Sequence, residues 1–253
     1  MDQAMIVSTV QPYFAPHAAF FAKAVRSDVM VFMDDVQFPQ RSTWLTRNRF
    51  KNDQGVVWLS VPVWKKGLGL QKIREVRLCN EGRWRRKHLT TLRAAYGRAP
   101  YFEEHKAFLE RLYGKNHEFL LDMNLELLRY LAQCLGIDTR MPLLSELNID
   151  AVEPHLSVAV AQALGATTFL AQKGALKYLD RSLFEEAGIG LAPIRIRPPV
   201  YPQLWGPFLS NLSVLDLLFN CGPAAARIIR MPAGGGRAGR QSARTGLQPS
   251  GNA

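Results

Sequence analysis

The chain is short of the residues from which disulfides and metal sites are built. Its three cysteines, Cys79, Cys134 and Cys221, are widely spaced and form neither a disulfide framework nor paired CxxC zinc ligands. The five histidines show no HxH or HExxH spacing, so we expect no metal site built from them. We therefore expect reduced thiols and no metal centre built from cysteine or histidine.

Long apolar runs and the commonest enzyme signatures are also missing. No run approaches the roughly 20 apolar residues of a membrane-spanning helix, and the N-terminus lacks the pattern of a secretion signal. We therefore expect a cytoplasmic protein without a membrane span. The chain contains no Walker A, GxGxxG or GxSxG motif, so the cofactor, if there is one, stays unknown.

The composition indicates a folded domain followed by a basic tail. Hydrophobic residues make up 47% of the 253 residues, and the formal net charge is +11. All 21 acidic residues lie at or before Asp216, whereas five arginines lie among small residues beyond Pro223. We expect a single α/β domain over residues 1–225 and a disordered Arg/Gly-rich tail over residues 226–253.

The first forty residues predict a βαβ unit. Apolar runs at residues 5–10 and 29–33 flank a helix-like stretch at 17–26. A crossover of this length joins parallel strands, so both strands end at the same edge of the sheet. We expect an α/β fold with an open, mostly parallel sheet and a helical insertion at about residues 81–140.

Further elements follow from local patterns. Residues 52–55 predict a turn before a third strand at 56–63, and 72–78 suit another strand. Ser157 and Ser213 are predicted N-caps, and Asp216 would complete a capping box with Ser213. The remaining predicted helices lie at 83–98, 101–114, 119–135, 157–165, 182–188 and 213–220, and the remaining strands at 167–170 and 189–196.

Polar residues follow both strands of the βαβ unit, where open parallel sheets bind ligands. Gln11 and Tyr13 follow the first strand, and Asp34, Asp35 and Gln37 follow the second. Adjacent side chains point in opposite directions, so at most one aspartate faces a given ligand unless the backbone turns. That aspartate could act as a general base or hold a cation. An equally good interpretation is that one carboxylate caps a turn and the other pairs with a nearby arginine.

Two further groups of residues could meet this crevice. His17 lies at the expected start of the crossover helix, and Arg47, Asn48 and Arg49 lie before the third strand. Arginines beside an aromatic residue suit a phosphate or carboxylate ligand, although a solvated loop has the same pattern. Lys65 would end at the same edge if the third strand is parallel.

The densest basic segment runs from Arg83 to Arg98, with no carboxylate between Glu81 and Glu103. Trp84, His88, Thr91 and Ala95 would form one helical face, which leaves the cations on a wide polar arc. This surface could bind RNA, an acidic partner or a nucleotide-linked substrate. A simple solvated helix face explains the same pattern.

Seven sequence blocks resemble the WbqC-like family in order, over about residues 5–222. They are MIVSTVQPYFAP, SDVMVFMDDVQF, TWLTRNRFKN, WLSVPV, LGATTFL, YPQLWGPF and NLSVLDLLFNCG. The positions that match the family's motifs are Gln11, Pro12, Tyr13, Phe14, Asp34, Asp35, Gln37, Arg47, Asn48, Asn211, Asp216 and Asn220.

The resemblance implies a role in building surface polysaccharide, O-antigen or a specialised metabolite, because related bacterial genes lie in such clusters. Two positions depart from the family pattern. Many relatives have a histidine where this chain has Val10, and Ser-Gly where it has Ala171-Gln172. If that histidine is the base elsewhere, this protein either uses another group or has lost activity.

The residues and the resemblance together predict a transferase that moves an acyl or aminoacyl group onto an activated sugar or similar acceptor. Asp35 or His17 would deprotonate the acceptor, and Arg47 and Arg49 would hold a phosphate. Gln11 and Asn48 would position the acceptor. The alternatives are a non-catalytic binder of RNA or an acidic partner through the basic helix and tail, and a structural subunit of an assembly complex.

Overall fold

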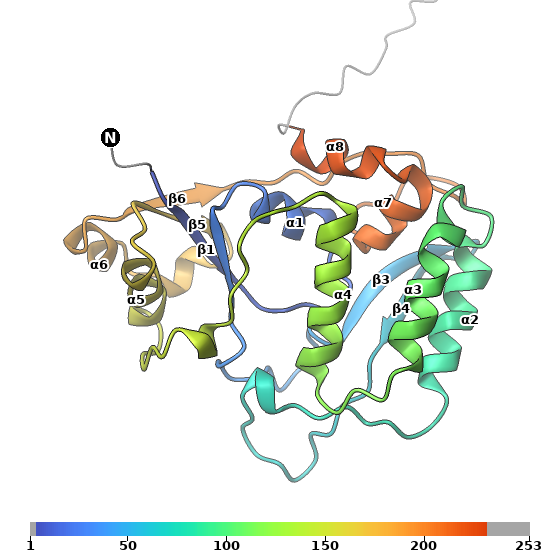
Figure 1. The fold of residues 1–253 in the computed structure, drawn as a ribbon, viewed down its shortest axis with the longest axis horizontal. Helices are drawn as coiled ribbons and strands as arrows, with labels where there is room; N and C mark the ends of the chain where they lie inside the picture. The colour runs from blue at the N-terminus through green and yellow to red at the C-terminus, as the bar shows by residue number, and fades with distance from the viewer. Residues whose placement is uncertain (1–3, 232–253) are drawn as a thin grey trace, which may run out of the picture.

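The computed structural model describes residues 4–231 of the chain. Four parallel strands form one sheet in the order β2-β1-β5-β6, and β3 and β4 form a separate antiparallel hairpin (Figure 1). Within the described residues, eight α-helices pack around these two sheets. The predicted α/β fold with an open parallel sheet is confirmed.

The βαβ unit has the predicted form. Strand β1 (Ile6–Val10) and strand β2 (Val29–Phe32) are parallel, and α1 (Ala18–Ala24) connects them. Every residue of β2 and of α1 is buried, which explains why both segments are almost continuously apolar.

The other half of the sheet lies on the opposite side of β1. Its strands are β5 (Thr168–Gln172) and β6 (Gly190–Ile194), and the helices of this half are α5 (His155–Ala163) and α6 (Arg181–Glu186). Strand β1 thus has β2 on one side and β5 on the other, so the strand order reverses between β1 and β5. The pairing of β1 with β5 covers only Ile6–Thr168 and Val7–Phe169, although both strands continue beyond it. The crevice expected at such a switch point therefore lies between these two strand ends.

The third predicted strand does not join the parallel sheet. Strand β3 (Arg47–Asn52) and strand β4 (Gly55–Ser60) pair antiparallel, with only two residues between them. A two-residue loop can connect only antiparallel strands, and Gly55 has a φ of 106° at its end. The sequence missed β3 because its residues are mostly polar. The strand expected at 72–78 is also wrong, since a single 3-10 turn, η1 (Ile73–Glu75), forms there.

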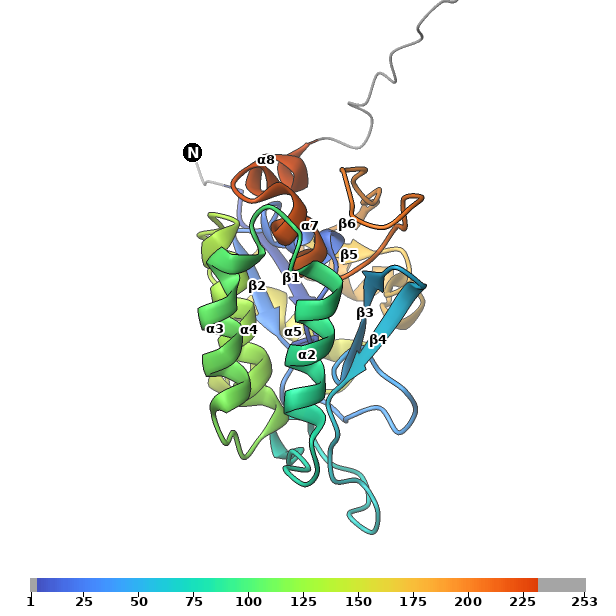
Figure 2. The ribbon, with the colours of Figure 1, turned by 90° about the vertical axis from the view of Figure 1, so that its right-hand side faces the viewer.

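The helical middle of the chain forms as predicted. Helices α2 (Trp84–Tyr96), α3 (Phe102–Gly114) and α4 (Leu120–Cys134) pack in one layer beside the hairpin (Figure 2). The larger hydrophobic core joins these helices to α1 and to the inner face of the hairpin. A second core lies on the other face of the sheet, under α5 and α6.

The C-terminal prediction needs a correction. Helix α7 (Val214–Cys221) is followed by α8 (Ala224–Arg230), so residues 226–230 are helical rather than disordered. Ala225 and Ile229 are buried against the core, and Nη1 of Arg230 donates to the Leu135 carbonyl at 2.8 Å. The rest of the predicted tail, residues 232–253, lies outside the described residues.

Of the two predicted helix caps, the one at Ser213 forms and the one at Ser157 does not. Ser213 does cap α7 through its hydroxyl, but the Asp216 carboxylate accepts hydrogen bonds from two tyrosines instead of completing a capping box. Ser157 lies inside α5, which has Pro154 at its N-cap position. Between residues 4 and 231, none of the helices is both long enough and apolar enough to cross a membrane.

Candidate functional site

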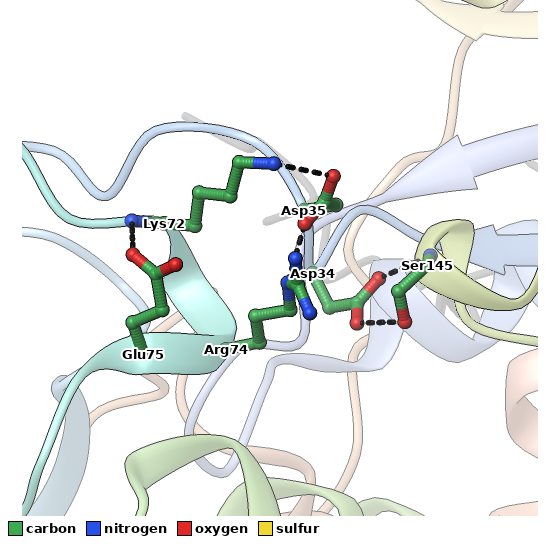
Figure 3. Close-up of polar contacts among 6 residues, drawn as sticks. All are labelled: Asp34, Asp35, Lys72, Arg74, Glu75 and Ser145. Atoms are coloured by element: carbon green, nitrogen blue, oxygen red, sulfur yellow. Dashed lines mark hydrogen bonds and ion pairs between the residues drawn. The ribbon is translucent and has the colours of Figure 1, made fainter. Parts of the chain in front are cut away.

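The two adjacent aspartates point in opposite directions and bind different turns of the chain (Figure 3). Asp34 is buried and accepts hydrogen bonds from Ser145, at 3.0 Å from the backbone nitrogen and 2.6 Å from the hydroxyl. Asp35 forms ion pairs with Lys72, at 2.7 Å, and with Arg74. Both carboxylates thus fasten the end of β2 to neighbouring turns.

The environment of Asp35 disfavours its use as a base. Partial burial alone would raise the pKa of Asp35, but hydrogen bonds and charges from Lys72 and Arg74 lower that pKa below its usual range. A carboxylate with a lowered pKa holds a proton poorly. Residues 4–231 contain no group of three His, Cys, Asp or Glu side chains arranged to hold a metal ion.

Asn48 acts on the loop that follows β1. Its side chain is buried, and Nδ2 donates to the carbonyls of Phe14 at 3.1 Å and Ala15 at 2.8 Å. Ala15 has a φ of 42°, a left-handed conformation that costs energy for a residue with a Cβ. The Asn48 amide therefore holds the loop of residues 11–17 in a strained shape beside β3.

The outer face of the hairpin is basic along β3. The antiparallel register places Arg47 opposite Ser60, Arg49 opposite Trp58 and Lys51 opposite Val56. Side chains alternate along a strand, so Arg47, Arg49 and Lys51 share one face. The buried residues Phe50 and Leu59 belong to the opposite, core-facing side.

The segment 201–213, between β6 and α7, covers half of this outer face. Lys51 donates from Nζ to Gln203 at 3.2 Å and to the Pro207 carbonyl at 2.7 Å. Arg49 donates from Nη2 to the carbonyls of Ser210 at 3.2 Å and Asn211 at 2.9 Å. Figure 2 shows this segment in orange near the β3–β4 hairpin.

The other half of the face stays open and is aromatic. The Arg47 guanidinium lies 4.3 Å from the centroid of the Trp58 ring, and the Trp44 and Trp58 rings are 5.7 Å apart. The two tryptophans are 39% and 42% exposed, which is unusual for such large apolar side chains. Among the described residues, Arg47 has no carboxylate within ion-pair distance.

His17 lies beside this face, at the N-cap of α1, and its backbone pairs with Ser213. Burial, together with the nearby Arg49 charge, lowers the pKa of His17, so the imidazole is neutral at pH 7. Its buried Nδ1 has no hydrogen-bond partner among residues 4–231, and neither has Nε of Arg49. A neutral imidazole with a free nitrogen can accept a proton.

The remaining predicted residues fall into two places. Gln11 and Tyr13 are half-buried in the loop that Asn48 holds, where burial raises the pKa of Tyr13. Gln37 is exposed, and its backbone pairs with that of Lys72 rather than with the β3–β4 hairpin. Lys65 lies 4.7 Å from the Phe38 ring and follows an antiparallel strand, so it does not end at the edge of the parallel sheet.

The structure therefore separates the predicted site into two groups. His17, Arg49 and the loop held by Asn48 come together with segment 201–213. Asp35 is bound instead to the turn containing Lys72 and Arg74. The sequence missed Trp58 and the covering segment. The YPQLWGPF block was the available signal for that segment.

These features define an α/β protein with a basic aromatic face next to a histidine whose Nδ1 has no hydrogen-bond partner among residues 4–231. Residues 11–228 match the WbqC-like protein family, so the chain belongs to that family. It is 32% identical over 226 residues to a Mycobacterium tuberculosis (strain ATCC 25618 / H37Rv) protein named "Uncharacterized protein Rv1507c". The alignment covers 88% of this chain and 97% of the relative. No solved structure matches the chain.

Proposed function

We propose that this protein is a transferase that moves an acyl or aminoacyl group onto an amine or hydroxyl of a nucleotide-activated sugar, in the synthesis of a surface polysaccharide or related metabolite. The observation that carries the proposal is the position of neutral His17 beside a face that combines arginines with exposed indole rings. Family membership supports the glycan setting.

The hairpin face suits a nucleotide-linked acceptor. Arg47 is free to pair with a phosphate, and Arg49 keeps an unused Nε beside its backbone contacts. Exposed tryptophan rings provide stacking surfaces for a base or a sugar. Gln11 contacts the acceptor from the loop of residues 11–17, and Asn48 fixes the shape of that loop.

His17 serves as the general base in this proposal. It takes a proton from the acceptor nitrogen or oxygen as that atom bonds to the carbonyl carbon of the donor. The bond from that carbon to a thiol or phosphate leaving group then breaks, and the leaving group departs with the electron pair. Positioned general bases of this kind contribute about 10²–10⁴-fold to the rate.

A reconstituted assay with UDP-linked amino sugars and coenzyme A thioesters tests the proposal. We expect His17→Gln to lower kcat by at least about 100-fold, with an unchanged thermal unfolding midpoint. Asp35→Asn is the matched control and should stay active, because Asp35 is engaged in ion pairs. Full activity of His17→Gln would overturn the role of the histidine, and full activity of Asp35→Asn would remove that aspartate as a base.

A second candidate function rests on α2. The exposed cations of α2 and of its two ends form no ion pair with other described residues; Arg86, Lys87 and Arg93 lie in the helix, and Arg83 and Arg98 flank it. Such a surface could bind RNA or an acidic partner. RNA binding would weaken steeply between 50 and 200 mM salt and would survive His17→Gln. Nucleotide-sugar binding at the hairpin would be lost in Arg47→Gln.

A further inference from the structure

A small cavity lies at the switch point of the sheet, where β1 and β5 separate. Its volume is about 140 Å³, and its lining includes Thr9 of β1 and Ala171 of β5. Val10 and Ala171, the two departures from the family pattern, lie at these same strand ends. Open parallel sheets place their ligands at such a point.

Lys23 supplies a positive charge to this cavity. The lysine belongs to α1 and is only 5% exposed, yet within residues 4–231 its Nζ makes a single hydrogen bond, to the Thr9 carbonyl at 2.5 Å. An ammonium group has three donors, so two are unused. No carboxylate of residues 4–231 pairs with it. Burial lowers the pKa of Lys23 to about 8, so the amine is still mostly charged at pH 7.

Glu153 supplies a negative charge to the same cavity from another element. It precedes α5, which packs in the second core, whereas α1 packs in the first. Its carboxylate accepts hydrogen bonds from the Ser157 hydroxyl at 2.6 Å and the Ser157 nitrogen at 3.4 Å. It forms no ion pair with a described residue. The cavity thus has an unpaired cation and an unpaired anion in its lining.

We propose that this cavity binds a small zwitterionic α-amino acid unit, with its carboxyl group at Lys23 and its ammonium group at Glu153. Burying the Lys23 charge without a partner is costly, and the Glu153 carboxylate, which is exposed at the rim, can pair with an ammonium group, so a ligand that carries both signs suits the two. A cavity of about 140 Å³ admits several water molecules, because about 10–15 Å³ is already enough to hold one. Glycine and alanine have a comparable number of heavy atoms.

The inference goes beyond the proposed function and does not rest on it, because the carboxylate of a zwitterionic amino acid carries no leaving group and the bound molecule is therefore not itself the acyl donor. The binding itself depends on Lys23, Glu153 and the cavity, and does not require His17.

Isothermal titration of the full chain with glycine and with L-alanine tests the binding. We expect saturable binding that weakens at least 10-fold in Lys23→Met and in Glu153→Gln. Glutamine keeps the acceptor for Ser157 and removes only the charge. The matched controls are Lys173→Met and Glu186→Gln, which change exposed residues outside the cavity lining and should bind like the wild type.

Further ligands separate the possible outcomes. Acetate and methylammonium each satisfy one charge, and we expect both to bind more weakly than glycine. Inorganic phosphate binding in place of glycine would show an anion site and overturn the inference, as would no binding of either amino acid. His17→Gln should keep the glycine affinity. Glycine binding in a protein that lacks transferase activity would sustain this site while the proposed function fails.

Discussion

Two polar clusters lie next to segment 201–213, and they use their hydrogen-bonding groups differently. In one, both oxygens of buried Asp216 accept hydrogen bonds, from Tyr96 at 2.9 Å and from Tyr201 at 2.8 Å. In the other, Nδ1 of His17 and Nε of Arg49 are buried without a partner among the described residues. Buried polar groups are nearly always satisfied in folded proteins. The first cluster therefore stabilises the fold, and the second leaves two polar atoms unsatisfied.

The largest effect should follow from breaking the satisfied cluster. Asp216→Ala leaves the hydroxyls of Tyr96 and Tyr201 without their acceptor in the core. We expect the free energy of unfolding to fall by about 3–5 kcal/mol, as when one partner of a buried charged network is removed. Urea denaturation measures this loss. Asp216→Asn keeps one acceptor and should lose less; an equal loss in both would show that the charge, not the hydrogen bonds, stabilises the cluster.

Lowering the pH should have the next largest effect on stability. The group responsible is His88, whose two ring nitrogens both have hydrogen-bond partners, unlike Nδ1 of His17. His88 contacts the Tyr113 hydroxyl at 3.2 Å and the Ser60 carbonyl at 3.1 Å. Burial lowers the pKa of His88 to about 4, although the hydrogen bond to Ser60 opposes this. Between pH 6.5 and 4 the unfolded chain binds the proton more readily, so stability falls as the pH falls. The loss from this group reaches on the order of 3 kcal/mol.

The measurement is the free energy of unfolding of the wild type and of His88→Gln between pH 4 and pH 7. The difference between the two proteins isolates this residue from the other groups that titrate. A wild type whose stability runs parallel to that of His88→Gln over this range would contradict the assignment.

How much the sequence predicts depends on how far each signal reaches along the chain. The βαβ unit and α3 and α4 were predicted well because their apolar periodicity is local. Strand β3 was missed because its sequence, RNRFKN, is stabilised by its partner β4 and by segment 201–213 rather than by its own apolar content. Such tertiary contacts leave no local pattern.

The candidate site shows the same limit. The sequence grouped Arg47, Asn48 and Arg49 because they are neighbours in the chain, whereas in β3 the Asn48 side chain lies on the buried side and the two arginines lie on the outer side. It could not show that Asp35 pairs with Lys72 and Arg74, nor that Lys23 and Glu153, which are 130 positions apart in the chain, line one cavity. Those relations depend on which turns pack together.

A smaller effect should follow from changing the open half of the hairpin face. Trp58→Ala removes an exposed ring that contacts both Trp44 and Arg47. We expect it to weaken the binding of UDP by about 1–3 kcal/mol, the range for losing one stacking contact. Titration calorimetry measures the affinity, with Trp64→Ala as the control because Trp64 is also exposed but lies outside β3 and β4. Equal losses in both variants would mean that UDP does not bind at the hairpin.

The smallest effect should come from the residue that the sequence made most conspicuous. Lys72 and Arg74, the partners of Asp35, are 45% and 46% exposed, and water screens such ion pairs. Asp35→Asn should therefore cost about 1 kcal/mol or less in urea denaturation and leave kcat unchanged. Asp34→Asn, which alters the buried contact with Ser145, should cost more. A 100-fold loss of kcat in Asp35→Asn at wild-type stability would instead return the role of base to the end of β2, because a loss of that size matches the removal of a general base.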